Sequence, residues 1–212
     1  MKTYYYFLIA AFVLVAGGCS KNDDDDASGG TNGTGTSTIN IDSQWQYFAK
    51  INGTSFSKVI GATVGGAYST SSQTAIPPDS SNAAYGSVLM DASLTNEYFD
   101  VTRNGHHFLG SSAENSEFLD FFSAGNYSYT TEEVNGVSIS WRDETTGTIW
   151  TTYNGSSDQT GSEFVIEQVK VLSTQFEYTI KVLAHFNCKL YDGSGNSKTV
   201  TEGKFVGQYS ND

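Results

Sequence analysis

Apolar and polar residues alternate along most of the chain beyond residue 44, which is the pattern of strands that bury one face. The longest example spans residues 176–191, where every second residue up to Leu190 is apolar. This alternation, together with the turn residues that interrupt it, predicts further strands at 59–69, 85–94, 97–102, 127–131, 137–143, 148–153, 164–172 and 197–209.

The first two strands form the clearest predicted hairpin. Residues 45–51 (WQYFAKI) and 54–60 (TSFSKVI) flank an Asn-Gly pair, which is the preferred sequence for a two-residue type I′ turn. Such a turn places Ala49 opposite Phe56, so apolar side chains meet on one face of the hairpin.

One segment departs from the strand pattern. In residues 111–122 (SSAENSEFLDFF), Phe118, Leu119 and Phe122 have helical spacing, and Ser112 is a candidate N-cap. We therefore predict an all-β fold, namely a single antiparallel β-sandwich of about ten strands with one short helix. The alternative is a closed, lipocalin-like β-barrel.

The N-terminus carries a different pattern. Lys2 precedes an apolar run from Tyr4 to Val15, and small residues follow, as in a secretory signal peptide. The run is shorter than the roughly 20 apolar residues that cross a bilayer as a helix. We predict that residues 1–18 are a signal peptide and that residues 39–212 form one β-sandwich domain.

Cys19 follows the small residues directly, and this arrangement resembles a bacterial lipobox. The resemblance implies cleavage before Cys19 and acylation of this residue, and two or more acyl chains anchor a protein stably in a membrane. Residues 19–38 would then be the lipidated cysteine, an acidic run and a flexible Gly/Ser/Thr-rich tether. An ordinary signal peptide with an incidental cysteine is the alternative.

Four consecutive aspartates lie just beyond the cysteine: Asp23, Asp24, Asp25 and Asp26. Adjacent like charges repel one another, so the run cannot belong to a packed fold. It is similar to the export signal that places lipoproteins of Bacteroides-type bacteria on the outer face of the outer membrane. The resemblance implies a lipid-anchored protein that faces the cell exterior, and the alternative is a solvated acidic spacer on a periplasm-facing anchor.

The domain itself also resembles a family. The segments FAKINGTSF (48–56), AGNYSY (124–129) and AHFNCKLYDGSGNSKTVTEGKF (184–205) are similar to those of uncharacterised small β-rich surface lipoproteins of Bacteroides-type bacteria. That family carries a K-x-N-G-x-x-F opening hairpin and a closing hairpin that ends in Asn or Glu followed by G-x-F. The resemblance implies an exported β-rich domain and transfers no catalytic residue.

The net charge argues against one class of partner, and the position of Cys188 argues against a reactive thiol. Residues 39–212 hold 9 Lys and Arg against 19 Asp and Glu, a net charge of −10. Nucleic-acid phosphates would be repelled, so we predict no nucleic-acid partner. Cys188 has apolar neighbours on its strand face and is therefore predicted to be an inert core residue rather than a reactive thiol.

Motifs for metal binding are weak. Residues 192–196 (DGSGN) match the first positions of a calcium loop, but the twelfth position would be Gly203, and a β-turn explains the same residues. His106 and His107 are adjacent on a strand and point to opposite faces, which is a poor arrangement for chelation. We predict no metal site and no cofactor.

Motifs for catalysis are weak as well. Strand carboxylates could supply a pair for glycoside hydrolysis, but no spacing selects one. Examples are Asp91, Asp100 and Glu167. We therefore predict that the protein is not an enzyme.

Aromatic residues give the main functional hint. Trp141, Trp150 and Tyr153 lie around one predicted hairpin, and exposed rings on a sheet can stack on sugars, with core packing as the alternative. Direct pairing of Trp141 with Trp150 would favour the core for both. We predict a non-catalytic binding or accessory module that captures extracellular glycan or another nutrient. The alternatives are an adhesion or structural component that pairs its strand edges with a surface protein and, third, a glycan-acting enzyme.

Overall fold

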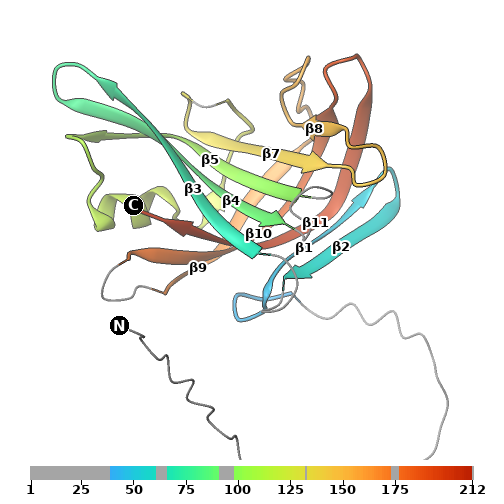
Figure 1. Cartoon of the computed structure of the whole chain (residues 1–212), viewed down its shortest axis with the longest axis horizontal. Coiled ribbons are helices and arrows are strands. Elements are labelled where there is room, and N and C mark those ends of the chain that lie inside the picture. Colours follow the sequence, from blue (N-terminus) through green and yellow to red (C-terminus); the bar gives the residue numbers. More distant parts are fainter. Residues whose placement is uncertain (1–38, 61–65, 91–97, 132, 173–176, 212) are drawn as a thin grey trace, which may run out of the picture. The chain divides into compact units, whose positions relative to one another are not determined.

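A computed structural model of the chain describes residues 39–60, 66–90, 98–131, 133–172 and 177–211 (Figure 1). These residues form eleven strands and one helix, α1 (Asn115–Phe121). The strands are β1 (Trp45–Ile51), β2 (Thr54–Ile60), β3 (Gly66–Ile76), β4 (Ser80–Met90), β5 (Tyr98–Leu109), β6 (Gly125–Asn126), β7 (Gly136–Arg142), β8 (Ile149–Thr151), β9 (Glu163–Val171), β10 (Thr179–Tyr191) and β11 (Ser197–Ser210).

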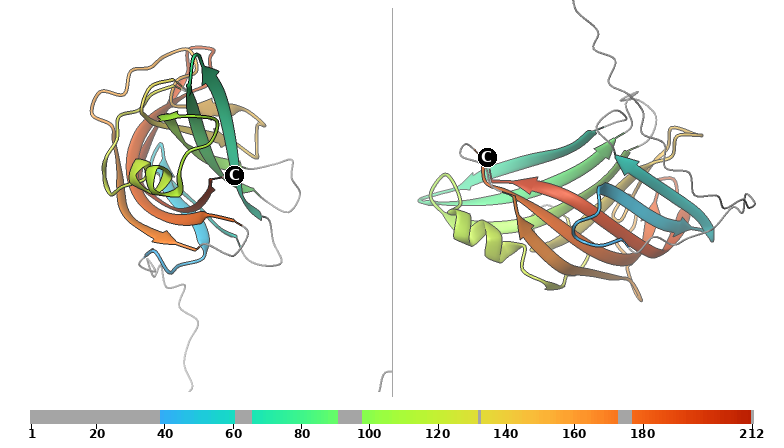
Figure 2. Two further views of the ribbon diagram at one scale, coloured as in Figure 1. Left: turned by 90° about the vertical axis from the view of Figure 1, so that its left-hand side faces the viewer. Right: turned by 90° about the horizontal axis from the view of Figure 1, so that it is seen from below.

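All of these strands belong to one antiparallel sheet. Its order is β2-β1-β11-β10-β8-β7-β5-β4-β3, with β9 attached to β10 and β6 to β9. The sheet curls into a half-barrel, which Figure 2 shows end-on. The predicted all-β class with one short helix is confirmed. The two opposed layers expected of a sandwich are the two sides of one continuous curled sheet, so the architecture lies between the predicted sandwich and its barrel alternative.

The sheet forks at β10. The first part of β10 pairs with β9 from Ile180 to Asn187, whereas its last residue, Tyr191, pairs with β8. The segment around β6 lies within the fork, since β6 pairs with β9 and Tyr129 forms a bridge to Val137 of β7. The fork thus brings Ser128, Tyr129 and Thr130 alongside the start of β7, where their backbone bonds to that of Val137.

The inner face of the curl holds the core. Every second residue of β10 is buried there: Ile180, Val182, Ala184, Phe186, Cys188 and Leu190. Helix α1 lies at one end of the curl (Figure 2). It packs Phe118 and Phe122 against Tyr85 of β4, with ring centroids 4.9 Å and 6.0 Å from that of Tyr85. The helix therefore covers an end of the core that the strands leave open.

Two serines connect the opposite sides of the curl. Beyond Val206, the described part of β1 no longer pairs with β11. There the Ser87 hydroxyl accepts a hydrogen bond from the backbone N–H of Gln208 at 2.9 Å, and the Ser69 hydroxyl accepts one from Ser210 at 2.7 Å. Strands β3 and β4 thus meet β11 through serine side chains.

The predicted first hairpin is confirmed. Asn52 and Gly53 have φ angles of 49° and 82°, as a type I′ turn requires, and Ala49 lies opposite Phe56. Asn52 is a residue that tolerates this left-handed conformation, which explains why the pair is Asn-Gly.

Several strand boundaries differ from those predicted. The expected strand over 59–69 is two elements, since β2 ends at Ile60 and β3 begins at Gly66, with residues 61–65 outside the described part. The 127–131 segment contains only an isolated bridge at Tyr129. Most of β3 was not predicted, because the run of Ser, Thr and Gln at residues 69–74 contains no apolar residue and therefore lacks a readable alternation.

The helix begins later than predicted. Its N-cap is Glu114 and not Ser112. The Glu117 carboxylate accepts a hydrogen bond from the backbone N–H of Glu114 at 3.0 Å, as in a capping box. A carboxylate three residues into the segment therefore fixes the start of the helix.

Candidate functional site

The outer face of the curl carries a hollow of about 560 Å³ over β3, β4, β5 and β7. We call this hollow the polar groove. Its floor comes from the four strands, whose lining residues are mostly Ser, Thr, Gly or Asn, and its rim comes from Thr131, Glu133, Val134 and Tyr153. On β4, β5 and β7, side chains that face outward thus line the groove, while their sequence neighbours are buried.

Cross-strand pairing assembles the floor. Gly86 of β4 lies opposite Thr70 of β3 and Thr102 of β5, and Thr102 lies opposite Ser138 of β7. A Cβ atom on Gly86 would lie 2.4 Å from Thr70 Oγ1 and 3.2 Å from Asp100 Oδ1. The glycine therefore leaves room for a hydroxyl and a carboxylate to converge over β4.

Asp100 is the charged residue of the floor. Its Oδ2 accepts a hydrogen bond from the Thr102 hydroxyl at 3.1 Å, whereas its Oδ1 is enclosed and has no hydrogen-bond partner. Burial raises the pKa of this carboxyl to about 6, against a smaller opposite effect of the Thr102 hydrogen bond. A carboxylate in a groove with acceptor positions that the protein does not use is a candidate ligand-binding group.

Asn104 connects the floor to the rim. Its amide donates to the Ser138 hydroxyl at 3.1 Å and to the backbone carbonyl of Thr130 at 3.3 Å, and its Oδ1 has no partner. The next residue, Gly105, has a φ of +73°, and a Cβ there would lie 2.3 Å from the backbone nitrogen of Asn135. Close contact with β5 thus holds both ends of the rim segment in place.

Arg103 holds the same segment from the inner face. This side chain is 1% exposed and donates to the backbone carbonyls of Gly136 and of Phe121, the latter at 2.9 Å. It also donates to Asn135 Oδ1 at 3.2 Å, and its guanidinium carbon lies 3.9 Å from the ring centroid of Tyr127. Burial lowers the pKa of Arg103 to about 10. One buried cation therefore joins the rim, the end of α1 and β5.

A smaller hollow of about 210 Å³ adjoins the polar groove. The two share Thr131, Val134 and Tyr153, so Tyr153 lies between them, with 43% of its surface exposed. The other lining residues of the smaller hollow are neutral and include Gln159. An extended ligand could therefore contact the Tyr153 ring while it occupies both hollows.

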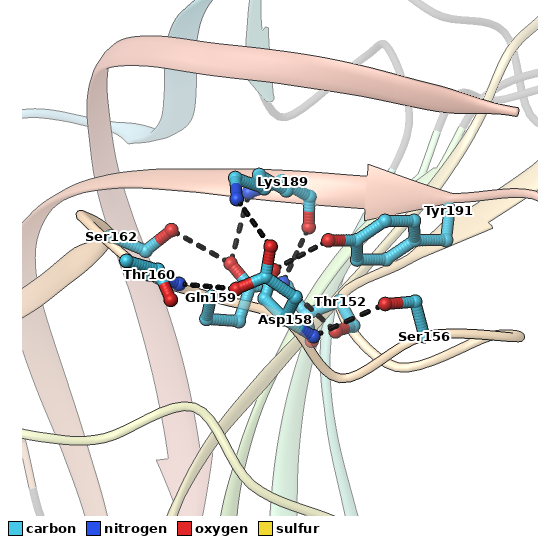
Figure 3. A network of polar contacts seen from close by, with 8 residues as sticks. All are labelled: Thr152, Ser156, Asp158, Gln159, Thr160, Ser162, Lys189 and Tyr191. Atoms are coloured by element: carbon cyan, nitrogen blue, oxygen red, sulfur yellow. Dashed lines mark hydrogen bonds and ion pairs between the residues drawn. The ribbon is translucent and has the colours of Figure 1, made fainter.

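Gln159 fixes the wall of the smaller hollow (Figure 3). Its Nε2 donates to the backbone carbonyls of Lys189 at 2.7 Å and Thr152 at 2.9 Å, and its Oε1 accepts from the Lys189 N–H at 2.9 Å. The side-chain amide thus pairs with both backbone groups of Lys189, as a neighbouring strand would. This contact fills the fork of the sheet, at the point where β9 has ended and β8 has not yet begun.

An ion pair lies beside this contact. The Lys189 ammonium is 2.7 Å from a carboxylate oxygen of Asp158, whose other oxygen accepts the backbone N–H of Thr160 at 3.0 Å (Figure 3). The hydrogen bond from Lys189, followed by those from Thr160, lowers the pKa of Asp158. Both partners are partly exposed, so their main effect is to orient the loop.

Two of the three aromatic residues predicted to bind a ligand lie in the core. Trp141 and Trp150 pair across β7 and β8, as the sequence suggested, and they are only 1% and 9% exposed. Neither ring can stack on a sugar, so their assignment as binding residues is wrong. Tyr153 is the exposed residue of the three and forms part of the rim. It lies two residues beyond the end of β8, so the alternation of inward and outward side chains along the strand no longer sets the direction of its ring.

The remaining candidate residues have structural roles. Cys188 is 2% exposed, as predicted, and burial raises the pKa of its thiol to about 12. His106 is buried and His107 exposed, which agrees with their predicted opposite orientations. Glu167 lies on β9 and pairs with His185 at 2.7 Å rather than with a carboxylate of the groove. Asp91 lies outside the described residues.

The predicted turn at Asp192 is present. Its Oδ1 accepts the backbone N–H groups of Ser194 at 2.8 Å and Asn196 at 3.1 Å. The carboxylate is thus used within its own turn. In the described part of the chain, no three or more His, Cys, Asp or Glu side chains come together as metal ligands would.

The predicted N-terminal sites lie outside the described residues: Cys19, Asp23, Asp24, Asp25 and Asp26. Within the described ranges, no helix has the length and apolar character needed to cross a membrane. No family model, curated protein or solved structure matches this chain.

The groove could not be located from the linear sequence. The sequence marks Asp100 only as one of several strand carboxylates and gives no indication of a role for Asn104. Residues 100, 102 and 104 do read Asp-x-Thr-x-Asn, so polar residues occupy the outward positions of β5. That spacing was the available signal, but only the pairing of β5 with β4 and β7 shows that these side chains meet others in a hollow.

Proposed function

We propose that this protein is a lipid-anchored outer-membrane protein that faces the cell exterior and binds extracellular glycan in the polar groove without catalysing a reaction. The observation that carries the binding proposal is the hydroxyl-lined floor, with the partly unpaired Asp100 carboxylate, below the exposed ring of Tyr153. The anchoring part rests on the lipobox-like Cys19 and the acidic run that follows it.

The lining of the groove suits a polyhydroxylated ligand. Sugar hydroxyls both donate and accept hydrogen bonds, and Thr70, Thr102 and Ser138 offer hydroxyls that do the same. Asp100 adds an acceptor with unused lone pairs. The ring of Tyr153 adds a flat apolar surface against which the C–H face of a sugar can pack. The adjoining hollow gives a second sugar unit a place on the other side of this ring.

The binding proposal is tested on a glycan array. The full-length chain is purified in a detergent without a sugar head group and compared with Tyr153→Ala. We expect the variant to lose roughly two- to tenfold in affinity for the glycan that the wild type binds, because stacking on the ring contributes about 0.5–1.5 kcal/mol beyond the area that it buries. Tyr68→Ala is the matched control, since Tyr68 is similarly exposed (47%) and does not line the groove.

Two results would contradict this function. Equal binding by wild type and Tyr153→Ala would exclude the groove as the site, and binding of no glycan would exclude the ligand class. Incubation of the bound glycan with the protein, followed by mass spectrometry of the sugar, tests the non-catalytic part. Shorter products would favour a glycan-acting enzyme.

An adhesion or structural role is the second candidate, and β3 favours it. This strand is the last in the sheet order, is eleven residues long and contains no charged residue. Edge strands that avoid association usually carry a charge, a proline or a bulge. Gln73→Lys would place a charge on this strand, and loss of self-association or of cell attachment in this variant, with glycan binding unchanged, would support the second candidate.

A further inference from the structure

We propose that the polar groove selects sugars that carry a protonated amino group, with the Asp100 carboxylate as the partner of the ammonium. This inference rests on the proposed function, because it specifies the glycan that the groove would bind. It is carried by the charges that line the groove and by the environment of one carboxylate.

Among the residues that the structure describes, every charged side chain that lines the two hollows is acidic. Asp100 lies in the floor and Glu133 lies in the rim, and none of the lining residues is Lys, Arg or His. A ligand carboxylate or sulfate would meet two negative groups and no positive one. The groove therefore disfavours acidic sugars and attracts cationic ones.

The Asp100 carboxylate has no positive partner within the described part of the protein. It accepts one hydrogen bond, from the Thr102 hydroxyl, and its second oxygen accepts none. Asn104, two residues along β5, also has an unpartnered buried oxygen. Two acceptor oxygens on β5 thus have no donor within the protein, and a group that supplies donors and a positive charge would complement this part of the floor.

A positive charge gains more at this position than a neutral hydroxyl does. Hydrogen bonds in which a partner is charged are roughly twice as strong as neutral ones, and the attraction is stronger in a partly enclosed groove than in water. The attraction does not require contact with the enclosed Oδ1, because it acts on the whole carboxylate. On this basis we expect an amine-bearing sugar to bind on the order of tenfold more tightly than the matching neutral sugar.

The neighbouring titratable groups leave Asp100 as the main source of any pH dependence in the floor. Tyr98 on the same strand and the buried Tyr209 of β11 interact electrostatically with this carboxylate, and their pKa values are raised, so both stay neutral at pH 5–8. Arg142 of β7 lies opposite Tyr98, and its guanidinium stays charged over the same range. Glu133 is the other acid of the groove. Because burial raises the pKa of Asp100 to about 6, the preference for the amine should weaken as the pH falls from 7.5 to 5.

The test uses three forms of each of three sugars, and the forms of one sugar differ only at C6. Tetramers of glucose, galactose and mannose are prepared with a hydroxyl, an amino or a carboxyl group at C6, and titrated calorimetrically against the full-length protein at pH 7.5 and pH 5. We expect the amino form to bind about tenfold more tightly than the hydroxyl form at pH 7.5, and the carboxyl form to bind more weakly than either.

Variants assign the preference to a residue. Asp100→Asn should reduce the ratio of amino to hydroxyl affinity to near one, and Glu133→Gln should reduce it less. Asp120→Asn is the charge-matched control, because Asp120 is exposed on α1 and does not line the groove. Equal affinity of wild type for the amino and hydroxyl forms would overturn this inference and leave the proposed function intact. Binding of none of the tetramers would overturn the proposed function itself.

Discussion

Burial of Asp100 has a cost to stability that can be measured. The folded-state pKa of this carboxyl is about 6, above its ordinary value of 3.8, so between these pH values the folded state holds more protons than the unfolded state. The free energy of unfolding therefore falls as the pH rises through this range and stays lower above it. A shift of this size corresponds to roughly 1–3 kcal/mol at pH 7.5.

Replacement of this residue should remove that cost. We expect Asp100→Asn to become more stable relative to the wild type as the pH rises from 4 to 7.5, by about 1–3 kcal/mol, while it weakens ligand binding. Urea unfolding at several pH values measures the difference, and Asp120→Asn serves as the exposed control. If the stability difference between wild type and Asp100→Asn does not change with pH, the pKa of the Asp100 carboxyl is not raised by folding.

For Cys188, in contrast to Asp100, we expect a role in packing alone. Its thiol should react slowly with an aqueous thiol reagent in the folded protein, because it is buried and burial raises its pKa to about 12. Cys188→Ala should cost about 1–2 kcal/mol of unfolding free energy. Cys188→Asp should cost considerably more, since it buries a charge among apolar neighbours. Rapid stoichiometric labelling of the native protein would contradict this account.

Residue identity predicted burial better than it predicted binding. Cys188, Trp141 and Trp150 belong to patterns whose period and pairing can be read along the chain, and core packing was the simpler interpretation of the two tryptophans. The exposed position of Tyr153 depends on where β8 ends, which the sequence does not fix. The role of Asp100 as a candidate ligand-binding group depends on Gly86 and Thr70, which belong to other strands.

At the level of elements, Gln159 replaces a piece of strand at the fork. Gln159→Leu would leave the N–H and C=O of Lys189 without these partners, so we expect a loss of about 2–4 kcal/mol in unfolding free energy. Chemical denaturation measures it, with Ser157→Ala as a control at an exposed position in the same loop. An effect as small as that of the control would mean that water substitutes for the amide at no cost.

The same elements show which part of the fold the sequence could predict. The type I′ hairpin and the long strands β10 and β11 follow from turn residues and regular alternation, and the structure agrees with them. Strand β3 could not be read, because its run of small polar side chains at 69–74 has no apolar member to mark a buried face. The fork was equally hidden, since a side chain rather than a strand completes it.

At the scale of the whole molecule, the described domain is one compact unit, and its proposed attachment to a membrane depends on residues before it. Cys19→Ala should release the protein from the membrane fraction, because the acyl chains that would hold it there are attached to this residue. Cell fractionation, together with mass spectrometry of the wild-type N-terminus, measures this. A wild-type protein without acyl groups, and a variant that stays membrane-bound, would contradict the lipobox interpretation.

The proposed surface exposure rests on a separate feature of the sequence, the acidic run. Replacement of the acidic run, Asp23 to Asp26, by alanine should leave the lipid in place but keep the protein on the periplasmic side. Protease treatment of intact cells measures how much protein is accessible from outside. If the variant is digested as readily as the wild type, the run acts only as a spacer.

The serines that join β3 and β4 to β11 also have a kinetic consequence. A ladder between two strands protects its amides collectively, since many bonds must break together before one proton is exposed. Ser87 and Ser69 each cover a single amide, those of Gln208 and Ser210, so these amides can be uncovered by the rotation of one side chain. Their hydrogens should therefore exchange with solvent sooner than those that β11 shares with β10. The curl would then loosen first along this line, while the ladder between β10 and β11 stays intact.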